Sequence, residues 1–319
     1  MSDAIRVSAP GSIMITGEHA VVYGTPAIVC AIEQRIEIKA TPITPNTLEI
    51  QSEIAPPLEC AFDDLPEDGP YRFVASAIAR YAARVPHGIR LEITSQIDPT
   101  LGLGSSAAVI SATLGVLARF TGDDRGPAWR ERLHSEALTI VRRLQGRGSG
   151  ADLAASLFGG MVAYQLPHSM LSETSTPGEY ADISRLGTPP PMGLSYCGYK
   201  MPTGEVLAKI AGARIGNEAK FDALYDQMGD NAIRCVAFAK SKDWPEMGSL
   251  MNEYQLLMET LGVSDAKLDQ MIRDARRHQG LLAAKISGSG LGDCILAFGD
   301  VPEGFTPVKF ADTGLIFHD

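Results

Sequence analysis

The sequence predicts an α+β protein built from two domains, and three observations lead to this. The chain has 319 residues, 45% of them hydrophobic, so it can bury a substantial core and is long for one domain. Strand and helix patterns are segregated, which favours sheets with helices on one side. A weakly patterned stretch rich in Ser, Thr and Pro covers residues 167–191 and marks a boundary. We expect an N-terminal domain over residues 1–170 and a C-terminal domain over residues 171–319.

The N-terminal half begins with strands and continues with helices. The Pro10-Gly11 pair predicts a turn between two short strands. Together with later apolar and alternating runs, the expected strands are residues 5–8, 12–16, 27–38 and 91–97. Apolar residues at helical spacing predict helices near residues 71–83, 105–120 and 127–145.

The C-terminal half carries fewer strand patterns. One strand is expected near residues 193–199, and several helices follow it. Two more strands are expected around residues 283–286 and 293–298. The chain shows no internal repeat and no low-complexity segment.

The charge and cysteine content limit the partners of the protein. A net charge of −10 argues against binding to nucleic acid or to a membrane surface. The 5 cysteines are odd in number and form no CxxC pair, as in a reducing cytosol. The start of the chain lacks the features of a signal peptide, and no apolar stretch is long enough to span a bilayer. We expect a cytoplasmic monomer or homodimer that acts on a small molecule.

The run DPTLGLGSSAA, residues 98–108, is the most informative motif. Gly102 and Gly104 allow the backbone to approach a ligand closely, and a helix begins directly after them. The N–H groups of a helix N-terminus bind anionic oxygens, which predicts a phosphate site. The hydroxyl groups of Ser105 and Ser106 are suited to capping the helix or to binding Mg²⁺ on a nucleotide.

Other interpretations compete for this motif. Gly102, Gly104 and Ala107 also fit a loose dinucleotide fingerprint, with Asp123 or Asp124 as its acidic residue. The alternating strand before the motif argues against this, because the first strand of a Rossmann fold is buried on both faces. A Walker loop is excluded because the chain contains no Gly-Lys pair. A capped helix after a tight turn is the structural alternative.

Two further motifs accompany the glycine loop, and the three together resemble those of the GHMP kinase superfamily. They are APGSIMITGEHAVVYGTPAI at residues 9–28 and AAKISGSGLGDC at residues 283–294, in the family's order. Residues 252–269 resemble the helical region before the third motif in mevalonate-pathway members. The resemblance implies an N-terminal domain like ribosomal protein S5 domain 2 and a ferredoxin-like C-terminal domain, with the active site between them.

The resemblance also implies which residues act. It places ATP at the glycine loop and Mg²⁺ at Ser106, and it makes Asp152 the catalytic or substrate-orienting carboxylate, although an acid early in a helix also has a structural explanation. The implied nucleotide-binding residues are Gly102, Leu103, Gly104, Ser105, Ser106 and Ala107. The implied acceptor-site residues from the outer motifs are Glu18, His19, Gly288, Ser289 and Gly290.

Two departures from mevalonate kinases put the ordinary site in doubt. Ser12 stands where those enzymes usually have a Lys beside the catalytic Asp. An ungapped match places Val141 where they carry a Glu that binds Mg²⁺. Ser12 is thus the residue at the catalytic Lys position, and Lys200 and Lys285 are the candidates for the missing positive charge.

The segment QGRGSGAD, residues 145–152, resembles phosphomevalonate kinases more closely, particularly the short proteobacterial ones. A phosphorylated acceptor would explain the local cations, Arg142, Arg143 and Arg147, although the first two also fit ordinary charges at a helix C-terminus. Arg147, Ser149 and Lys200 are therefore added as acceptor-binding residues.

The resulting expectation is an ATP- and Mg²⁺-dependent kinase that converts (R)-5-phosphomevalonate to the 5-diphosphate. A mevalonate kinase with a rearranged site is the first alternative, and a diphosphomevalonate decarboxylase is the second. A catalytically silent sensor with the same fold is an alternative of another class.

Overall fold

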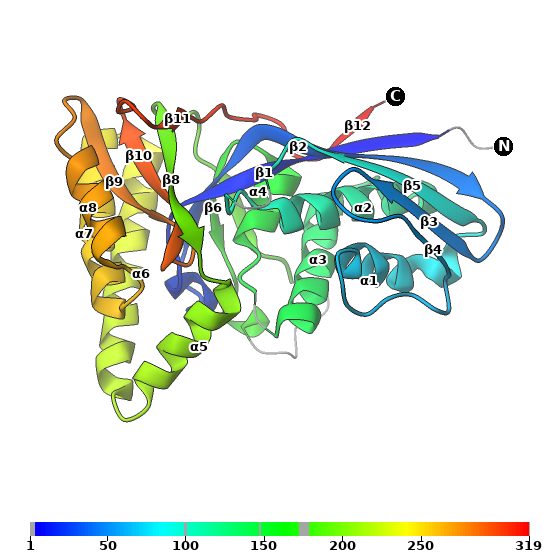
Figure 1. The fold of residues 1–319 in the computed structure, drawn as a ribbon, viewed down its shortest axis with the longest axis horizontal. Helices are drawn as coiled ribbons and strands as arrows, with labels where there is room; N and C mark the ends of the chain where they lie inside the picture. Colours follow the sequence, from blue (N-terminus) through cyan, green and yellow to red (C-terminus); the bar gives the residue numbers. More distant parts are fainter. Residues whose placement is uncertain (1–3, 99–100, 147, 172–178, 319) are drawn as a thin grey trace.

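The computed structural model describes residues 4–98, 101–146, 148–171 and 179–318. Arg147 lies outside these residues, so its predicted role has no structural description. The described chain forms two sheets, each with helices packed against it (Figure 1). The predicted α+β architecture is confirmed.

The larger sheet occupies the N-terminal part and has the strand order β12-β1-β2-β5-β3-β4, with β6 paired to β2 and β7 paired to β6. Four helices, α1 to α4, lie along one of its faces (Figure 1). The strands are β1 (Ile5–Thr16), β2 (Ala27–Ile43), β3 (Thr47–Ser52), β4 (Leu58–Ala61), β5 (Gly88–Ser95), β6 (Met161–Gln165), β7 (Asp182–Arg185) and β12 (Ile316–His318). The helices are α1 (Arg72–Tyr81), α2 (Ser105–Thr121), α3 (Trp129–Gln145) and α4 (Ala151–Phe158).

The smaller sheet has the order β11-β8-β10-β9 and packs against helices of the C-terminal part (Figure 1). Its strands are β8 (Met192–Lys200), β9 (Leu281–Ser287), β10 (Gly292–Gly299) and β11 (Thr306–Pro307). The helices of this part are α5 (Thr203–Arg214), α6 (Glu218–Ser241), α7 (Trp244–Leu261) and α8 (Ala266–Ala275). Short 3₁₀ turns lie at Ala20–Tyr23, Ala82–Arg84 and His168–Met170.

The larger sheet includes strands from both ends of the chain. β12 pairs with β1, and β7 pairs with β6, although both lie beyond residue 170. The first and last strands of the described chain, β1 and β12, consequently lie side by side in Figure 1. The division of the chain at residue 170 stays a prediction.

The predicted turn at Pro10-Gly11 is wrong, because β1 runs through it as one strand. The pairing with β2 shifts register between Pro10 and Ser12, so the pair forms a β-bulge. Proline has no N–H to donate, and a bulge is one of the few places in a sheet that tolerates it. A Cβ on Gly11 would lie only 2.6 Å from the carbonyl oxygen of Leu103. The bulge therefore brings β1 against the glycine loop.

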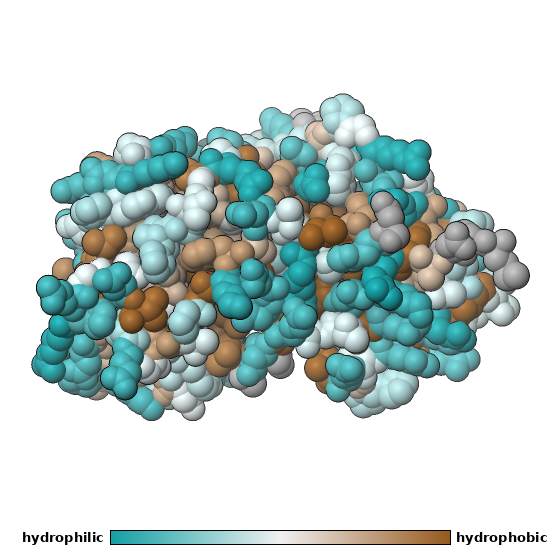
Figure 2. Space-filling model, turned by 90° about the horizontal axis from the view of Figure 1, so that it is seen from above, coloured by the Kyte–Doolittle hydropathy of each residue, from teal (hydrophilic) through white to brown (hydrophobic). Residues whose placement is uncertain are grey.

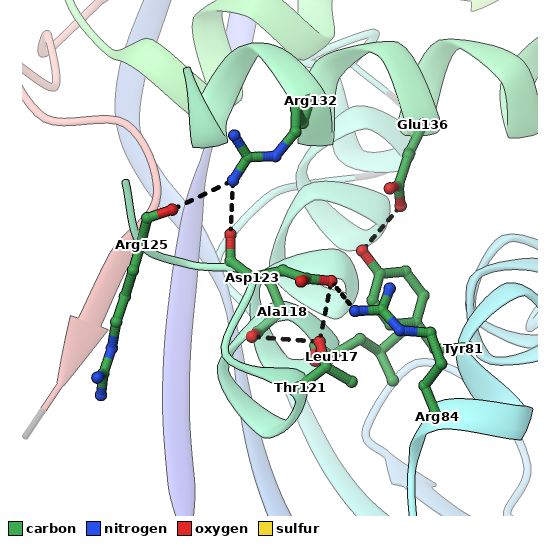
Figure 3. A network of polar contacts seen from close by, with 9 residues as sticks. All are labelled: Tyr81, Arg84, Leu117, Ala118, Thr121, Asp123, Arg125, Arg132 and Glu136. Carbon is green, nitrogen blue, oxygen red and sulfur yellow. Dashed lines mark hydrogen bonds and ion pairs between the residues drawn. The ribbon is translucent and has the colours of Figure 1, made fainter. Parts of the chain in front are cut away.

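Asp123 and Asp124, the acidic residues that a dinucleotide fingerprint would require, contact other side chains in the fold. The carboxylate of Asp123 is bound by Arg84 and by the hydroxyl of Thr121, at 3.1 Å (Figure 3). Asp124 pairs with Arg119 at 2.6 Å. Both acids follow the C-terminal end of α2, whose 17 residues span about 25 Å. Asp123 joins the end of α2 to the 3₁₀ turn at Ala82–Arg84, and Asp124 pairs with a residue of α2 itself, so both act far from the glycine loop.

No helix among the described residues is long and apolar enough to cross a bilayer. The face in Figure 2 is mostly hydrophilic, and its hydrophobic residues are scattered over it.

Candidate active site

The three sequence motifs and the start of α4 meet at the bulge of β1. The backbone N–H of Ser12 donates to the carbonyl oxygen of Leu103 at 3.0 Å, which joins the first motif to the glycine loop. The hydroxyl of Ser287, in the third motif, donates to the carbonyl oxygen of Met14 at 2.9 Å. Cys294, the last residue of that motif, contacts the carbonyl oxygen of Leu101 through its sulfur at 3.5 Å. The first motif, the glycine loop and the third motif therefore contact one another at the junction between the two sheets.

The glycine loop has the shape of a phosphate cradle. Gly102 and Gly104 have φ values of 67° and 68°, which side chains rarely adopt. A Cβ on Gly104 would lie 2.0 Å from Oγ of Ser12, so only glycine fits this approach. No side chain caps the first turn of α2, and the hydroxyl-bearing residue Ser106 is exposed there. Leu103 and Ala107 are buried beneath the loop and fix it to the core. These features fit a nucleotide phosphate.

The fit to Mg²⁺ depends on the nucleotide. Mg²⁺ takes oxygen ligands and is commonly shared between protein groups and substrate phosphates. The described residues contain no cluster of three His, Cys, Asp or Glu side chains that could hold a metal by themselves. Val141 packs against Gly148 and offers no ligand. Ser106 is the residue that would bind the ion together with phosphate oxygens.

Asp152 lies in the first turn of α4 and contacts the bulge. Its Oδ1 accepts a hydrogen bond from the fully buried hydroxyl of Ser12 at 2.7 Å. Burial raises the pKa of Asp152 above its usual value, and the negative charge of Glu18 raises it further. The hydrogen bond from Ser12 and the positive charge of Lys200 oppose this increase in the pKa of Asp152. Ser12, Glu18 and Lys200 thus all act on one carboxylate.

Three side chains hold the loop that leads to Asp152. Its consecutive carbonyl oxygens, at residues 148, 149 and 150, each accept a hydrogen bond. Arg142 binds the first at 3.3 Å, Tyr164 the second, and His134 the third at 2.9 Å. Burial lowers the pKa of His134 to about 4, so the ring is neutral at pH 7 and must carry its proton on Nε2 to donate. We name these three side chains the carbonyl clamp.

A buried ion pair joins the two sheets beside this loop. Nζ of Lys285, on β9, lies 2.5 Å from Oε1 of Glu18, which follows β1. Neither side chain is more than 3% exposed. Tyr254, on α7, donates to the carbonyl oxygen of Glu18 at 2.6 Å. These two contacts hold Glu18 in place, as expected of a residue that the resemblance assigns to the acceptor site.

His19 connects the first and third motifs directly. Its Nε2 lies 3.0 Å from the carbonyl oxygen of Ser289. Burial lowers the pKa of His19, so the neutral ring donates this bond. Gly288 and Gly290 shape the same turn with φ values of 106° and 82°. The hydroxyl of Ser289 faces Thr203 at the start of α5, with the two oxygens 3.4 Å apart.

The arginines after α3 separate into different environments. Arg142 donates to backbone carbonyls at Gly148 and Met170, so it holds chain segments together rather than binding a phosphate. The side chain of Arg143 is 71% exposed and lies 4.0 Å from Glu67. Neither supports the predicted phosphate-binding role. Ser149 contributes through its backbone and through its hydroxyl, which accepts from the N–H of Ala151 at 3.2 Å.

The second candidate cation, Lys200, lies at the end of β8. Its Nζ is 2.9 Å from Oδ1 of Asp293, and its side chain is 33% exposed. Asp293 is a functional candidate that the sequence motifs did not predict. Its position as an acid among the glycines of the third motif is the one signal that could have indicated it.

Comparison with known families matches this arrangement. The family model described as the GHMP kinases N terminal domain matches residues 71–160, and the GHMP kinases C terminal model matches residues 235–303. A mevalonate kinase from Thermococcus sibiricus is 31% identical over 92% of this chain and 88% of its own length. The chain belongs to the GHMP kinase family. The predicted family and its two-domain fold are thereby confirmed, and GHMP kinases use ATP.

Solved structures support the same fold for this GHMP kinase. A Lin0012 protein from Listeria innocua covers 99% of this chain and all of its own, with a TM-score of 0.86 and 22% identity. A phosphomevalonate kinase from Streptococcus pneumoniae, solved with phosphomevalonate and AMPPNP, covers 94% of this chain and 93% of its own. Its TM-score is 0.74 and its identity is 18%. At these identities the structures establish the fold and leave the acceptor open.

Proposed function

We propose that this GHMP kinase transfers the γ-phosphoryl group of ATP to the phosphate of (R)-5-phosphomevalonate, in the mevalonate route to isoprenoids. The bond between the γ-phosphorus and the bridging oxygen breaks, and a bond to an oxygen of the acceptor phosphate forms. ADP leaves with the electron pair, and the second product is (R)-5-diphosphomevalonate. Mg²⁺ on the nucleotide would neutralise phosphate charge during transfer. The enzyme would act in the cytoplasm.

The pairing of Ser12 with Asp152 carries the choice of acceptor. An alcohol such as mevalonate must lose a proton during transfer, whereas a phosphate acceptor already has an anionic oxygen near neutral pH. Ser12 orients Asp152 at 2.7 Å but adds no positive charge, unlike the Lys that mevalonate kinases usually carry there. This arrangement suits an acceptor that needs orientation more than deprotonation.

A dianionic acceptor also needs cations, because burying its charge alone would be prohibitive. Lys200 is partly exposed, and its charge acts on Asp152. Arg147 belongs to the glycine turn before Asp152 in the sequence and is the second proposed partner. Guanidinium and ammonium groups both bind phosphate through charge-assisted hydrogen bonds.

A mevalonate kinase with a rearranged site is the second candidate. The name of the Thermococcus sibiricus relative favours it, since that protein is a mevalonate kinase and shares 31% identity with this chain. The raised pKa of Asp152 also suits a base that removes a proton from an alcohol.

A coupled assay of ADP release distinguishes the two candidates. Purified enzyme would be tested with (R)-mevalonate, (R)-5-phosphomevalonate and (R)-5-diphosphomevalonate at equal concentrations. We expect rapid turnover with phosphomevalonate, and its loss in the variant Asp152→Asn would assign the activity to this site. Rapid turnover of mevalonate with no activity on phosphomevalonate would refute the proposal.

Substitution of Arg147 tests the acceptor phosphate separately. A charge-assisted contact is worth about 1.5–3 kcal/mol, so Arg147→Ala should raise the KM for phosphomevalonate about tenfold to a hundredfold. The KM for ATP should stay nearly unchanged. Arg143→Ala is the matched control, because that side chain is exposed toward Glu67. Equal effects of both substitutions would remove Arg147 from the acceptor site.

A further inference from the structure

Asp293 is a buried acid placed between two phosphate-binding loops. Its side chain is 6% exposed. A Cβ on Gly102, in the nucleotide loop, would lie 3.0 Å from its Oδ1. A Cβ on Gly288, in the third motif, would lie 3.6 Å from its Oδ2. The carboxylate therefore borders both glycine loops at once.

The backbone of Asp293 adopts an unfavourable conformation that sets the direction of its side chain. Asp293 has a φ of 65°, in the left-handed region that L residues rarely adopt. The pairing of β10 with β8 is irregular at this point, where the register shifts between Gly292 and Cys294. Such bulges commonly re-aim a side chain next to a functional site. Without the bulge, Asp293 would follow the regular alternation of β10.

A carboxylate in this position would repel nucleotide and acceptor phosphates unless a cation accompanied it. Lys200 supplies that cation, with Nζ 2.9 Å from Oδ1 of Asp293. The two residues come from neighbouring strands, β8 and β10. Because Lys200 is anchored at one end by Asp293, its charge stays near the glycine loops and Asp152 instead of moving into solvent.

We propose that Asp293 is a positioning residue that holds Lys200 between the two glycine loops, where the ammonium group stabilises the transferring phosphate. Lys200 then supplies the positive charge that Ser12 lacks. This inference rests on the proposed function only in requiring phosphoryl transfer, because the transferring phosphate is common to every acceptor considered.

Four variants test it in the full-length enzyme: Lys200→Met, Lys200→Arg, Asp293→Asn and Asp293→Gly. Asn keeps the shape of the Asp side chain, whereas Gly removes the side chain and readily adopts the left-handed backbone of this position. Both replacements remove the same negative charge, so an effect that they share is due to the charge. Asp222→Asn is the control, because it breaks an ion pair with Arg214 at 2.6 Å that lies between α5 and α6. The acceptor used is the one that the wild type turns over most rapidly.

We expect Lys200→Met, Asp293→Asn and Asp293→Gly to lower kcat about tenfold to a hundredfold, as the loss of a charge-assisted contact would. The KM for ATP should change far less, whereas the KM for phosphomevalonate should rise, because the proposed function also has Lys200 contact the acceptor phosphate. Lys200→Arg should retain most of the activity, and Asp222→Asn should retain all of it. Because Asp293 acts through Lys200, the double variant Lys200→Met with Asp293→Asn should be no slower than Lys200→Met alone.

Three results would overturn the inference. Multiplicative losses in the double variant would mean that the two residues act independently. Full activity of Asp293→Gly would mean that the carboxylate is not needed. An effect of Asp293→Asn confined to the Mg²⁺ dependence of ADP binding, measured by calorimetry, would make Asp293 a metal ligand instead. If the wild type prefers mevalonate, the proposed acceptor fails, and the same comparisons still decide the role of Asp293.

Discussion

Replacement of Ser12 by Ala isolates the contact on which our proposal for the acceptor depends. The Ser12 hydroxyl is fully buried and donates to Asp152 at 2.7 Å. Gly104 lies against it, so the substitution removes one oxygen and leaves little room for other groups to move in. A hydrogen bond to a charged group is worth about 1.5–3 kcal/mol. If the bond is fully used in the transition state, Ser12→Ala should lower kcat about tenfold to a hundredfold.

The pH dependence of Ser12→Ala supplies a second readout. Burial raises the pKa of Asp152, and the hydrogen bond from Ser12 lowers it. Removing that bond should raise the pKa of Asp152 further, so the carboxylate is charged only at higher pH. The acidic limb of kcat against pH should therefore move to higher pH in the variant, with the same acceptor and the same metal concentration. Unchanged kcat and an unchanged acidic limb would refute a role of this contact in turnover.

Three other predictions concern the glycine loop, Asp152 and the carbonyl clamp. Gly104→Val should abolish nucleotide binding in calorimetry, because even a Cβ would lie 2.0 Å from Oγ of Ser12. Ser106→Ala should lower turnover more than nucleotide affinity. Equal losses of turnover and of affinity in Ser106→Ala would contradict a role of its hydroxyl in the reaction. Asp152→Asn should cut kcat by roughly 10²–10⁴ without lowering the Tm at pH 7, since burial of the charged form is unfavourable; a folded variant with most of its activity would exclude Asp152 from the reaction. The pKa of His134 falls to about 4 in the folded protein, so the free energy of unfolding should decline as pH falls from about 6.5 to about 4. His134→Gln should weaken this pH dependence. Urea titrations of both proteins at pH 5 and pH 7 would measure the difference.

Sequence patterns predicted the elements whose periodicity is strong. The helix expected over residues 105–120 is α2, Ser105–Thr121, and the one expected over residues 127–145 is α3, Trp129–Gln145. The proximity of Ser12 to Asp152 could also be predicted, because the resemblance places both beside the same phosphate. Strands β3, β4, β6, β7 and β12 were not predicted. Each is only 3–6 residues long, too short for a clear alternation.

Contacts between distant segments account for what the sequence could not predict about the site. Arg142 and Arg143 are adjacent in the sequence, yet one binds backbone carbonyls and the other is exposed. The positive charge of both residues is compatible with a phosphate, whereas the contacts of Arg142 with the carbonyl oxygens of Gly148 and Met170 arise only in the folded chain. Asp293 could not be predicted because a bulge, which has no reliable sequence pattern, re-aims it toward Gly102. The carbonyl clamp likewise depends on tertiary packing.

Lys285 and Lys200, the two candidates for the missing positive charge, differ in exposure and therefore in their access to a substrate. Lys285 is fully buried and pairs with Glu18 at 2.5 Å, joining the two sheets. Moving it toward a phosphate would leave Glu18 as an uncompensated buried charge, and removing one partner of such a pair costs about 3–5 kcal/mol. Lys200 is 33% exposed, so its ammonium group can bind a phosphate while its partner Asp293 remains close. The buried lysine therefore holds Glu18 in place, and the partly exposed one is the lysine that we propose to act in the reaction.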